Sequence, residues 1–244
     1  MSRRRASRRG RRRLWSYALA GVLVAFVLLA GVLLFHPWTG RGRETTTTGS
    51  SKPIILYVNQ GNGAVNATNF GSMLSFARSH GFNAVFFQVY REGALLFQPS
   101  DLASFVQEAH AQGLAIYLAL YFTNSSQRLP SSVYALGEDG INLDMSTLPL
   151  SAQSSLLTSV QQAYHAGKVS ITTTDLTLPL KPDVLVLETY GSGYDSYIRP
   201  GIVASVGVFT TSSKAQYEQE FLYALQNSDG VMVFDYAGLL KSGY

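Results

Sequence analysis

The chain of 244 residues contains no cysteine. This excludes disulfide bonds, thiolate metal ligands and a cysteine nucleophile, so an exported domain with this sequence must be held together by its core alone. Histidine is scarce: there are four, and no two of them have the spacing of a metal-ligand pair. A nucleophile elbow is also missing. We therefore expect no metal, no cofactor and no acyl-transfer chemistry.

Acidic residues are nearly absent from the first fifty positions, where only Glu44 occurs, whereas eight arginines lie between Arg3 and Arg13. From Pro53 onward the balance reverses, with eight Lys and Arg against fourteen Asp and Glu, hence a net charge of −6. The basic pI near 9.3 therefore belongs to the N-terminal tail. An acidic body does not indicate a nucleic-acid-binding domain, so we expect no nucleic-acid partner.

One long uncharged run follows the arginines, with 22 apolar or small residues from Leu14 to Phe35. At ~1.5 Å per residue, a helix of this length spans the ~30 Å hydrocarbon layer of a membrane. The arginine cluster predicts a cytoplasmic N-terminus and an extracytoplasmic body. A cleaved signal peptide is the alternative, but the run exceeds a usual signal core and lacks a clear cleavage site. We predict a basic tail at 1–13, a transmembrane helix at 14–36 and a Thr/Gly/Ser linker at 37–52, followed by one domain at 53–244 of a single-pass cell-membrane protein.

Short apolar runs alternate with helix-like segments throughout that domain. We expect eight strands, at 54–58, 84–90, 115–121, 140–144, 168–174, 184–188, 202–209 and 231–235, and four helices, at 69–80, 99–112, 151–165 and 213–227. This alternation favours parallel strands with helices outside, and eight strands favour closure into a (β/α)8 TIM-like barrel. The connections at 175–183 and 189–201 are too short for full helices, so we expect a compact, partly trimmed barrel.

A doubly wound open sheet is the competing α/β architecture. It calls for a glycine-rich phosphate-binding turn after the first strand. Residues 60–65 hold only a partial Gly-x-Gly pattern without the third glycine. The barrel is therefore the better prediction.

Residues 139–146 read Asp-Gly-Ile-Asn-Leu-Asp-Met-Ser. This segment resembles the D-G-x-D-x-D-x-E strand of the chitinase-like glycoside hydrolases, with matches at Asp139, Gly140 and Asp144. Asn142 stands at the family's middle Asp, and Ser146 at its catalytic Glu. The segments 81–90 and 229–236 resemble strands of glycoside-hydrolase-like (β/α)8 barrel proteins, and the segment 108–114 resembles the E-A-H-x-x-G-L lead into their third strand. The resemblance implies a sugar-processing barrel, but without a Glu at position 146 it does not supply the mechanism.

Acidic residues stand at the exits of four predicted strands: Asp144, Asp175, Glu188 and Asp235. The strand-exit face of such a barrel carries the active site. Neighbouring strands lie ~4.8 Å apart, so the ends of the fourth and sixth strands should be ~9–10 Å apart. This approaches the ~6.5–9.5 Å that separates the two carboxyl groups of an inverting glycosidase. We predict Glu188 as general acid, Asp144 as base and Asp235 as a third catalytic carboxylate, although acid and base could be exchanged. The apolar residues before Glu188 are expected to raise its pKa.

Other polar and aromatic residues at the strand exits are candidates for substrate binding. Side chains alternate between the two faces of a strand, so Gln88 should lie on the same face as the small Ala84. A small residue suits the crowded inside of a barrel, so we expect Gln88 to point inward. Tyrosines at exits could stack on sugar rings. The alternative is structural: the acids cap loops or pair with Arg91 or Arg199, and the tyrosines pack at the rim. The predicted substrate-binding residues are Gln88, Tyr121, Asp175, Tyr190 and Tyr236.

These features together predict a membrane-anchored, extracytoplasmic glycoside-hydrolase-like domain that acts on a cell-surface polysaccharide. The alternative is a catalytically inactive barrel that binds a glycan or a partner at the cell envelope. In both cases the expected partners are a glycan and, through residues 14–36, the membrane.

Overall fold

The computed structural model describes residues 52–60, 65–124, 126–127, 131–175, 181–190, 194–208 and 213–244. The predicted tail, membrane segment and linker up to residue 51 lie outside these ranges. Among the described residues, no helix is both long enough and apolar enough to cross a bilayer. Residues from Lys52 to Tyr244 form one compact unit.

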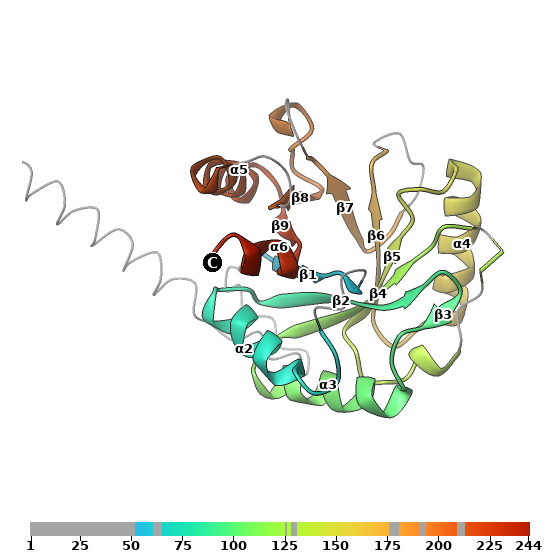
Figure 1. Ribbon diagram of the computed structural model, residues 1–244. Helices are drawn as coiled ribbons and strands as arrows, with labels where there is room; N and C mark the ends of the chain where they lie inside the picture. Colours follow the sequence, from blue (N-terminus) through green and yellow to red (C-terminus); the bar gives the residue numbers. More distant parts are fainter. Residues whose placement is uncertain are drawn as a thin grey trace, which may run out of the picture. The chain divides into compact units, whose positions relative to one another are not determined.

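Eight parallel strands close into a barrel with helices on its outside (Figure 1). The hydrogen-bonded order is β1-β9-β8-β7-β6-β5-β4-β2, and β2 pairs again with β1. This closure rules out the open sheet. The strands are β1 Ile54–Val58, β2 Ala84–Arg91, β4 Ala115–Tyr121, β5 Gly140–Asp144, β6 Lys168–Thr173, β7 Val184–Glu188, β8 Val203–Gly207 and β9 Gly230–Phe234.

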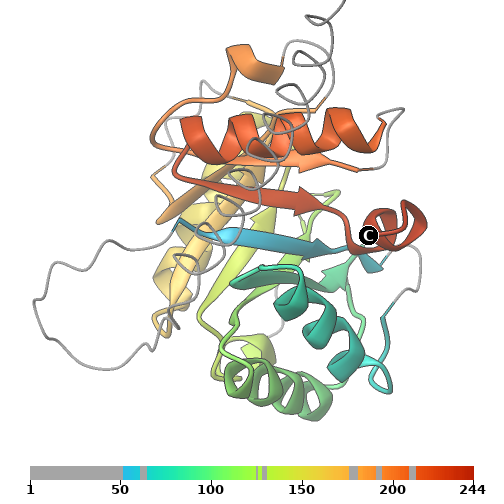
Figure 2. The same ribbon diagram turned by 90° about the vertical axis from the view of Figure 1, so that its left-hand side faces the viewer.

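The described residues also form five helices: α2 Phe70–Ser79, α3 Pro99–Ala111, α4 Leu150–Ala163, α5 Lys214–Asn227 and α6 Tyr236–Lys241. Figure 2 shows α2 and α3 below the strands and α5 above them. The four long helices confirm the periodicity argument; in α3, for example, the buried residues are Leu102, Phe105, Val106 and Ala109. The six-residue helix α6 was not predicted.

The trimming of the barrel is confirmed in the part of the chain that the structure describes. No helix occurs in the described residues between β6 and β7, and only the 3-10 turn η3, Tyr194–Ser196, lies between β7 and β8. A similar turn, η2 at Ser131–Val133, lies in the described part of the β4–β5 connection. One strand is additional: β3, Ala94–Leu95, folds back antiparallel on β2.

The hydrophobic residues form two separate cores. Alternate strand residues pack against the helices, while the others fill the barrel. Gly140 leaves no room for a side chain, because a Cβ there would overlap the ring of Tyr117 and the backbone oxygen of Lys168. The inner core comprises Ile55, Tyr57, Ala84, Phe86, Tyr117, Ala119, Val186, Val203 and Met232.

Candidate active site

A cavity of about 280 Å³ opens at the carboxyl ends of the barrel strands. Its walls come from six strand ends and the short loops that follow them, so residues far apart in the chain meet here. Two carboxylic acids and one guanidinium are among them. The lining residues are Tyr57, Asn59, Gln88, Arg91, Tyr121, Asp144, Ser146, Glu188, Tyr190 and Phe234.

Asp144 ends β5 and is only 6% exposed. The Tyr57 hydroxyl on β1 donates a hydrogen bond to its Oδ2 at 3.0 Å, and the Ser146 hydroxyl donates to its Oδ1 at 3.3 Å. Burial raises the pKa of Asp144 to about 6, while these two hydrogen bonds act in the opposite direction because they stabilise the carboxylate. Asp144 is therefore mostly ionised at neutral pH.

Glu188 ends β7 and faces the same cavity. Burial, together with the negative charge of Asp144, raises the pKa of Glu188 to about 7. Glu188 is therefore more readily protonated near neutral pH than an ordinary glutamate. A pair in which one acid holds a proton more readily than the other is suited to acid and base catalysis.

The strand register refines the predicted spacing of this pair. Asp144 is level with Thr172 of β6, and Thr172 is level with Val186 of β7. Glu188 therefore lies two residues, ~6.7 Å, further along its strand than Asp144. The prediction had treated the two exits as level. Because hydrogen-bonded neighbours in a closed barrel are staggered along its axis, this two-residue offset across two strands leaves Asp144 and Glu188 at a similar depth.

The other predicted acids lie elsewhere. Asp235 is the N-cap of α6, where its Oδ1 accepts a hydrogen bond from the backbone N–H of Gly238 at 2.8 Å. Asp175 follows β6, and its backbone N–H donates to Thr173 Oγ1 at 3.1 Å. The cavity lining includes neither residue. Asp235 therefore fits the alternative in which an acid at a strand exit caps the following segment, and we leave it out of the catalytic pair.

Tyr236 is also absent from the cavity lining. It is the first residue of α6, is buried, and packs edge-on against Phe76 with ring centroids 5.1 Å apart. This ring is part of the core between α6 and α2 and offers no free face to a sugar.

Three predicted binding residues do reach the cavity: Gln88, Tyr121 and Tyr190. Gln88 is buried, and its Oε1 accepts a hydrogen bond from the backbone N–H of Gln60 at 2.8 Å. The Tyr190 hydroxyl is 2.8 Å from Ser205 Oγ. These bonds fix both side chains in the wall, so the cavity is largely preformed.

Sequence reasoning missed Tyr57 and Ser146 as functional residues and considered Arg91 only as an ion-pair partner. Tyr57 could have been found from its parity, because it follows the inward Ile55 by two residues. Arg91 could not, since it enters the cavity through a β-bulge. The register with β4 shifts between Gln88 and Tyr90, so that Arg91 is level with the inward Tyr121. Tyr90, which simple alternation placed inside, belongs to the outer core.

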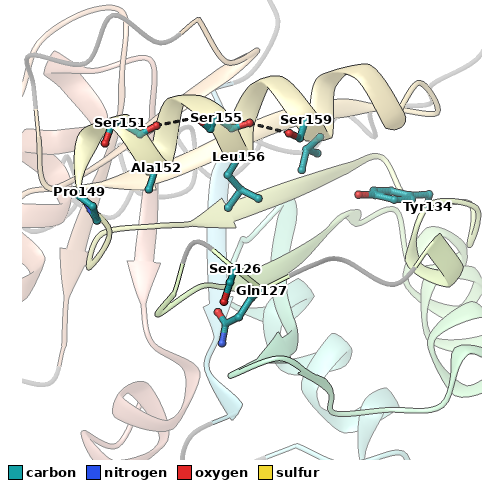
Figure 3. Close-up of a pocket in the computed structure, with 10 residues that line it drawn as sticks. Ser126, Gln127, Tyr134, Pro149, Ser151, Ala152, Ser155, Leu156 and Ser159 are labelled. Carbon is teal, nitrogen blue, oxygen red and sulfur yellow. Dashed lines mark hydrogen bonds between the residues drawn. The ribbon is translucent and has the colours of Figure 1, made fainter.

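A second, larger groove of about 820 Å³ runs along α4 on the outside of the barrel (Figure 3). Ser151, Ser155 and Ser159 lie along α4, and the hydroxyls of Ser155 and Ser159 donate to the backbone carbonyl one turn earlier. The described lining residues include no carboxylate. The described part of this groove therefore offers no acid for acid–base chemistry, despite its size.

No protein-family profile matches the chain, and no curated protein matches it. Several solved structures are similar to it in fold. A dihydrodipicolinate synthase from Agrobacterium tumefaciens is 11% identical over 79% of this chain and 72% of its own, with a TM-score of 0.50. A tryptophan synthase from M. tuberculosis is 14% identical over 75% and 83%, with a TM-score of 0.51. A GH18 chitinase from Flavobacterium johnsoniae is 11% identical over 77% and 89%, with a TM-score of 0.48. At such identities the likeness to the two synthases shows the TIM-barrel fold alone.

Proposed function

We propose that this protein is a glycoside hydrolase that acts on a cell-surface polysaccharide through Glu188 and Asp144. The observation that supports this most directly is that the two acids line one cavity at the strand exits while their pKa values are raised to about 7 and about 6. Such a pair supplies a proton and a base in the same pH range.

In the proposed reaction, protonated Glu188 gives its proton to the glycosidic oxygen as the bond between that oxygen and the anomeric carbon breaks. Asp144 removes a proton from the water whose oxygen forms the new bond to the anomeric carbon. Tyr57 holds the Asp144 carboxylate in place through the 3.0 Å hydrogen bond. Atoms balance: one water is consumed and two sugar hydroxyls are produced. Two acids that flank a water give inversion at the anomeric carbon.

Because position 146 is a serine, the proposed reaction needs a proton donor from another strand, and Glu188 is the candidate. Ser146 occupies the position of the proton-donating Glu in the chitinase-like pattern, and its hydroxyl instead bonds to Asp144 at 3.3 Å. In this proposal the proton donor has moved from the end of β5 to the end of β7. The same Ser146 is also the observation that favours the second candidate, an inactive barrel that binds a glycan without cleaving it.

The test is release of reducing sugars from a panel of polysaccharides by the full-length chain. Glu188→Gln and Asp144→Asn should each lower the rate by about 10²–10⁴-fold, while Glu218→Gln, on the exposed surface of α5, should leave it unchanged. The rate should peak between pH 6 and 7, because Asp144 must be ionised and Glu188 protonated. Binding without turnover, unaffected by either substitution, would instead support the inactive barrel.

Membrane anchoring through residues 14–36, with the N-terminus cytoplasmic and the barrel extracytoplasmic, forms part of the proposal. It rests on the uncharged run and the preceding arginines. Protease added to intact cells should digest the barrel domain and spare the N-terminal tail. Protection of the barrel would place it in the cytoplasm, away from a cell-surface substrate.

A further inference from the structure

Arg91 is a cation placed in a cavity whose catalytic groups are acids. It ends β2 and lines the same cavity as Asp144 and Glu188. No other Lys or Arg is among the described residues that line it. The described domain carries an excess of acid, so a guanidinium at this position calls for a specific explanation.

The backbone of β2 is arranged to bring Arg91 inside. The bulge between Gln88 and Tyr90 changes the parity of the strand, so that Tyr90 turns outward and Arg91 comes level with the inward Tyr121. Bulges beside active sites commonly redirect a side chain in this way. Without the extra residue, Arg91 would point toward the helices. The irregularity thus serves the position of one side chain.

The turn that follows holds the guanidinium from two directions. Glu92 has a φ of 53° and Gly93 a φ of 88°, which folds β3 back on β2. A two-residue hairpin turn of this kind needs a positive φ at both central positions, and this costs about 1 kcal/mol at Glu92 because it is not a glycine. The Oε1 of Glu92 accepts a bond from Arg91 Nε at 3.2 Å, and the guanidinium carbon lies 5.5 Å from the centre of the Tyr121 ring. The bond through Nε leaves both terminal nitrogens of the guanidinium out of this ion pair.

Arg91 does not serve as the counter-ion of the catalytic acids. The groups that lower the pKa of Asp144 are the hydroxyl of Tyr57 and the side chain and backbone of Ser146, and both influences on Glu188 raise its pKa. Arg91 is paired through Nε with the exposed Glu92 and not with the proposed catalytic acids, so a molecule that enters the cavity beside those acids can meet its terminal nitrogens.

We propose that Arg91 forms a subsite for the carboxylate of an acidic sugar, so that the substrate is a polysaccharide that contains uronic acid. This rests on the proposed function and specifies its substrate class. A planar carboxylate fits the paired nitrogens of a guanidinium. A phosphate dianion would need more than one cation and would lie close to ionised Asp144. The net charge of −6 over the body repels a polyanion, so recognition depends on this one residue and not on a basic surface.

The experiment is calorimetric binding to the full-length chain, with short oligomers of glucuronate, galacturonate and mannuronate as probes. Each acid is compared with its methyl ester, which has the same sugar without the charge. We expect at least one acid to bind about 10-fold more tightly than its ester. Arg91→Gln should abolish that preference and leave ester binding unchanged, and Arg91→Lys should retain part of it because the charge remains.

Arg199→Gln is the matched control, since it removes one positive charge from an exposed position outside the cavity. The subsite is disproved if no acid is preferred over its ester, if Arg91→Gln weakens acid and ester equally, or if a sulfated oligosaccharide binds more tightly than every carboxylate. The readout is binding, so it is independent of cleavage. If the protein prefers acids through Arg91 but cleaves nothing, the subsite is supported and the hydrolase is refuted. If it cleaves neutral glycans through Glu188 but shows no preference for acids, the hydrolase is supported and the subsite is refuted.

Discussion

Replacement of Glu188 by Gln should make the protein more stable at pH 8 and leave its stability at pH 4.5 nearly unchanged. The side chains have the same shape, so the change removes a charge and little else. The folded state raises the pKa of Glu188 from 4.5 to about 7, which means that the fold prefers the protonated form. The stability contributed by this group is fully present below pH 4.5 and is lost as the pH rises through 7.

The magnitude follows from the shift. A change from 4.5 to about 7 corresponds to about 3 kcal/mol in the free energy of unfolding, at 1.36 kcal/mol per pH unit. This is an upper value, because part of the Glu188 side chain faces solvent, which screens its charge. For a domain of this size, each kcal/mol changes the Tm by ~2–4 °C. The Gln variant should therefore melt several degrees higher at pH 8.

The assay is thermal and urea unfolding of the wild-type chain and Glu188→Gln at steps between pH 4.5 and 8. The difference between the two should grow with pH, most steeply between pH 5 and 7. Glu218→Gln, an exposed replacement of the same type on α5, should show no such growth. Parallel stability curves for wild type and Glu188→Gln would refute the reasoning, since Glu188 would then titrate alike in the folded and unfolded chains and would be a poor proton donor near neutral pH.

Three further predictions concern the support of the site and of the barrel. Tyr57→Phe removes a hydrogen bond that stabilises ionised Asp144, so the acidic limb of the pH–rate profile should move upward by about 1 pH unit. Asp235→Ala should lower the free energy of unfolding by about 1 kcal/mol, because the N-cap of α6 is lost. Asp235→Asn keeps an accepting oxygen, so it should keep both stability and activity. A loss of activity in Asp235→Asn would instead support a catalytic role for Asp235. Gly140→Ala should lower the free energy of unfolding by about 1–3 kcal/mol, because its Cβ has no room. Gly71→Ala is the control and should not destabilise the barrel, because its Cβ meets only the movable end of an exposed glutamate. Equal effects of the two substitutions would contradict the packing argument.

The fold was predictable because its signal is repeated. All eight barrel strands are short apolar runs, and the structure places each within two residues of its predicted bounds. The two elements that were missed are the two-residue strand β3 and the six-residue helix α6. Neither is long enough to show a period of two or 3.6 residues. Their signals were Glu92-Gly93 as a turn and Asp235 as a cap, and Asp235 was interpreted as catalytic.

The candidate site was predictable only in part, because proximity to a strand exit does not fix the direction of a side chain. Asp144 and Glu188 follow the inward Asn142 and Val186 by two residues, so they point into the barrel. Asp235 lies beyond the end of β9, where strand parity no longer applies, and its Oδ1 accepts the cap bond from Gly238. Proximity to the strand exit therefore did not distinguish this cap from the pair that lines the cavity. The bulge that turns Arg91 inward has no comparable signal in the sequence.

The inner face of the barrel also explains how an Asn can stand at position 142, where the resembling family has an acid. Asn142 Nδ2 donates to Ser170 and Thr172, both at 3.0 Å, below the cavity. A carboxylate at 142 could not donate these bonds, and it would add a buried negative charge next to Asp144. In this barrel Asp144 is oriented instead from the opposite wall, by Tyr57. The polar network of β5 and β6 therefore forms a neutral floor, which adds no further negative charge that would raise the pKa values of Asp144 and Glu188.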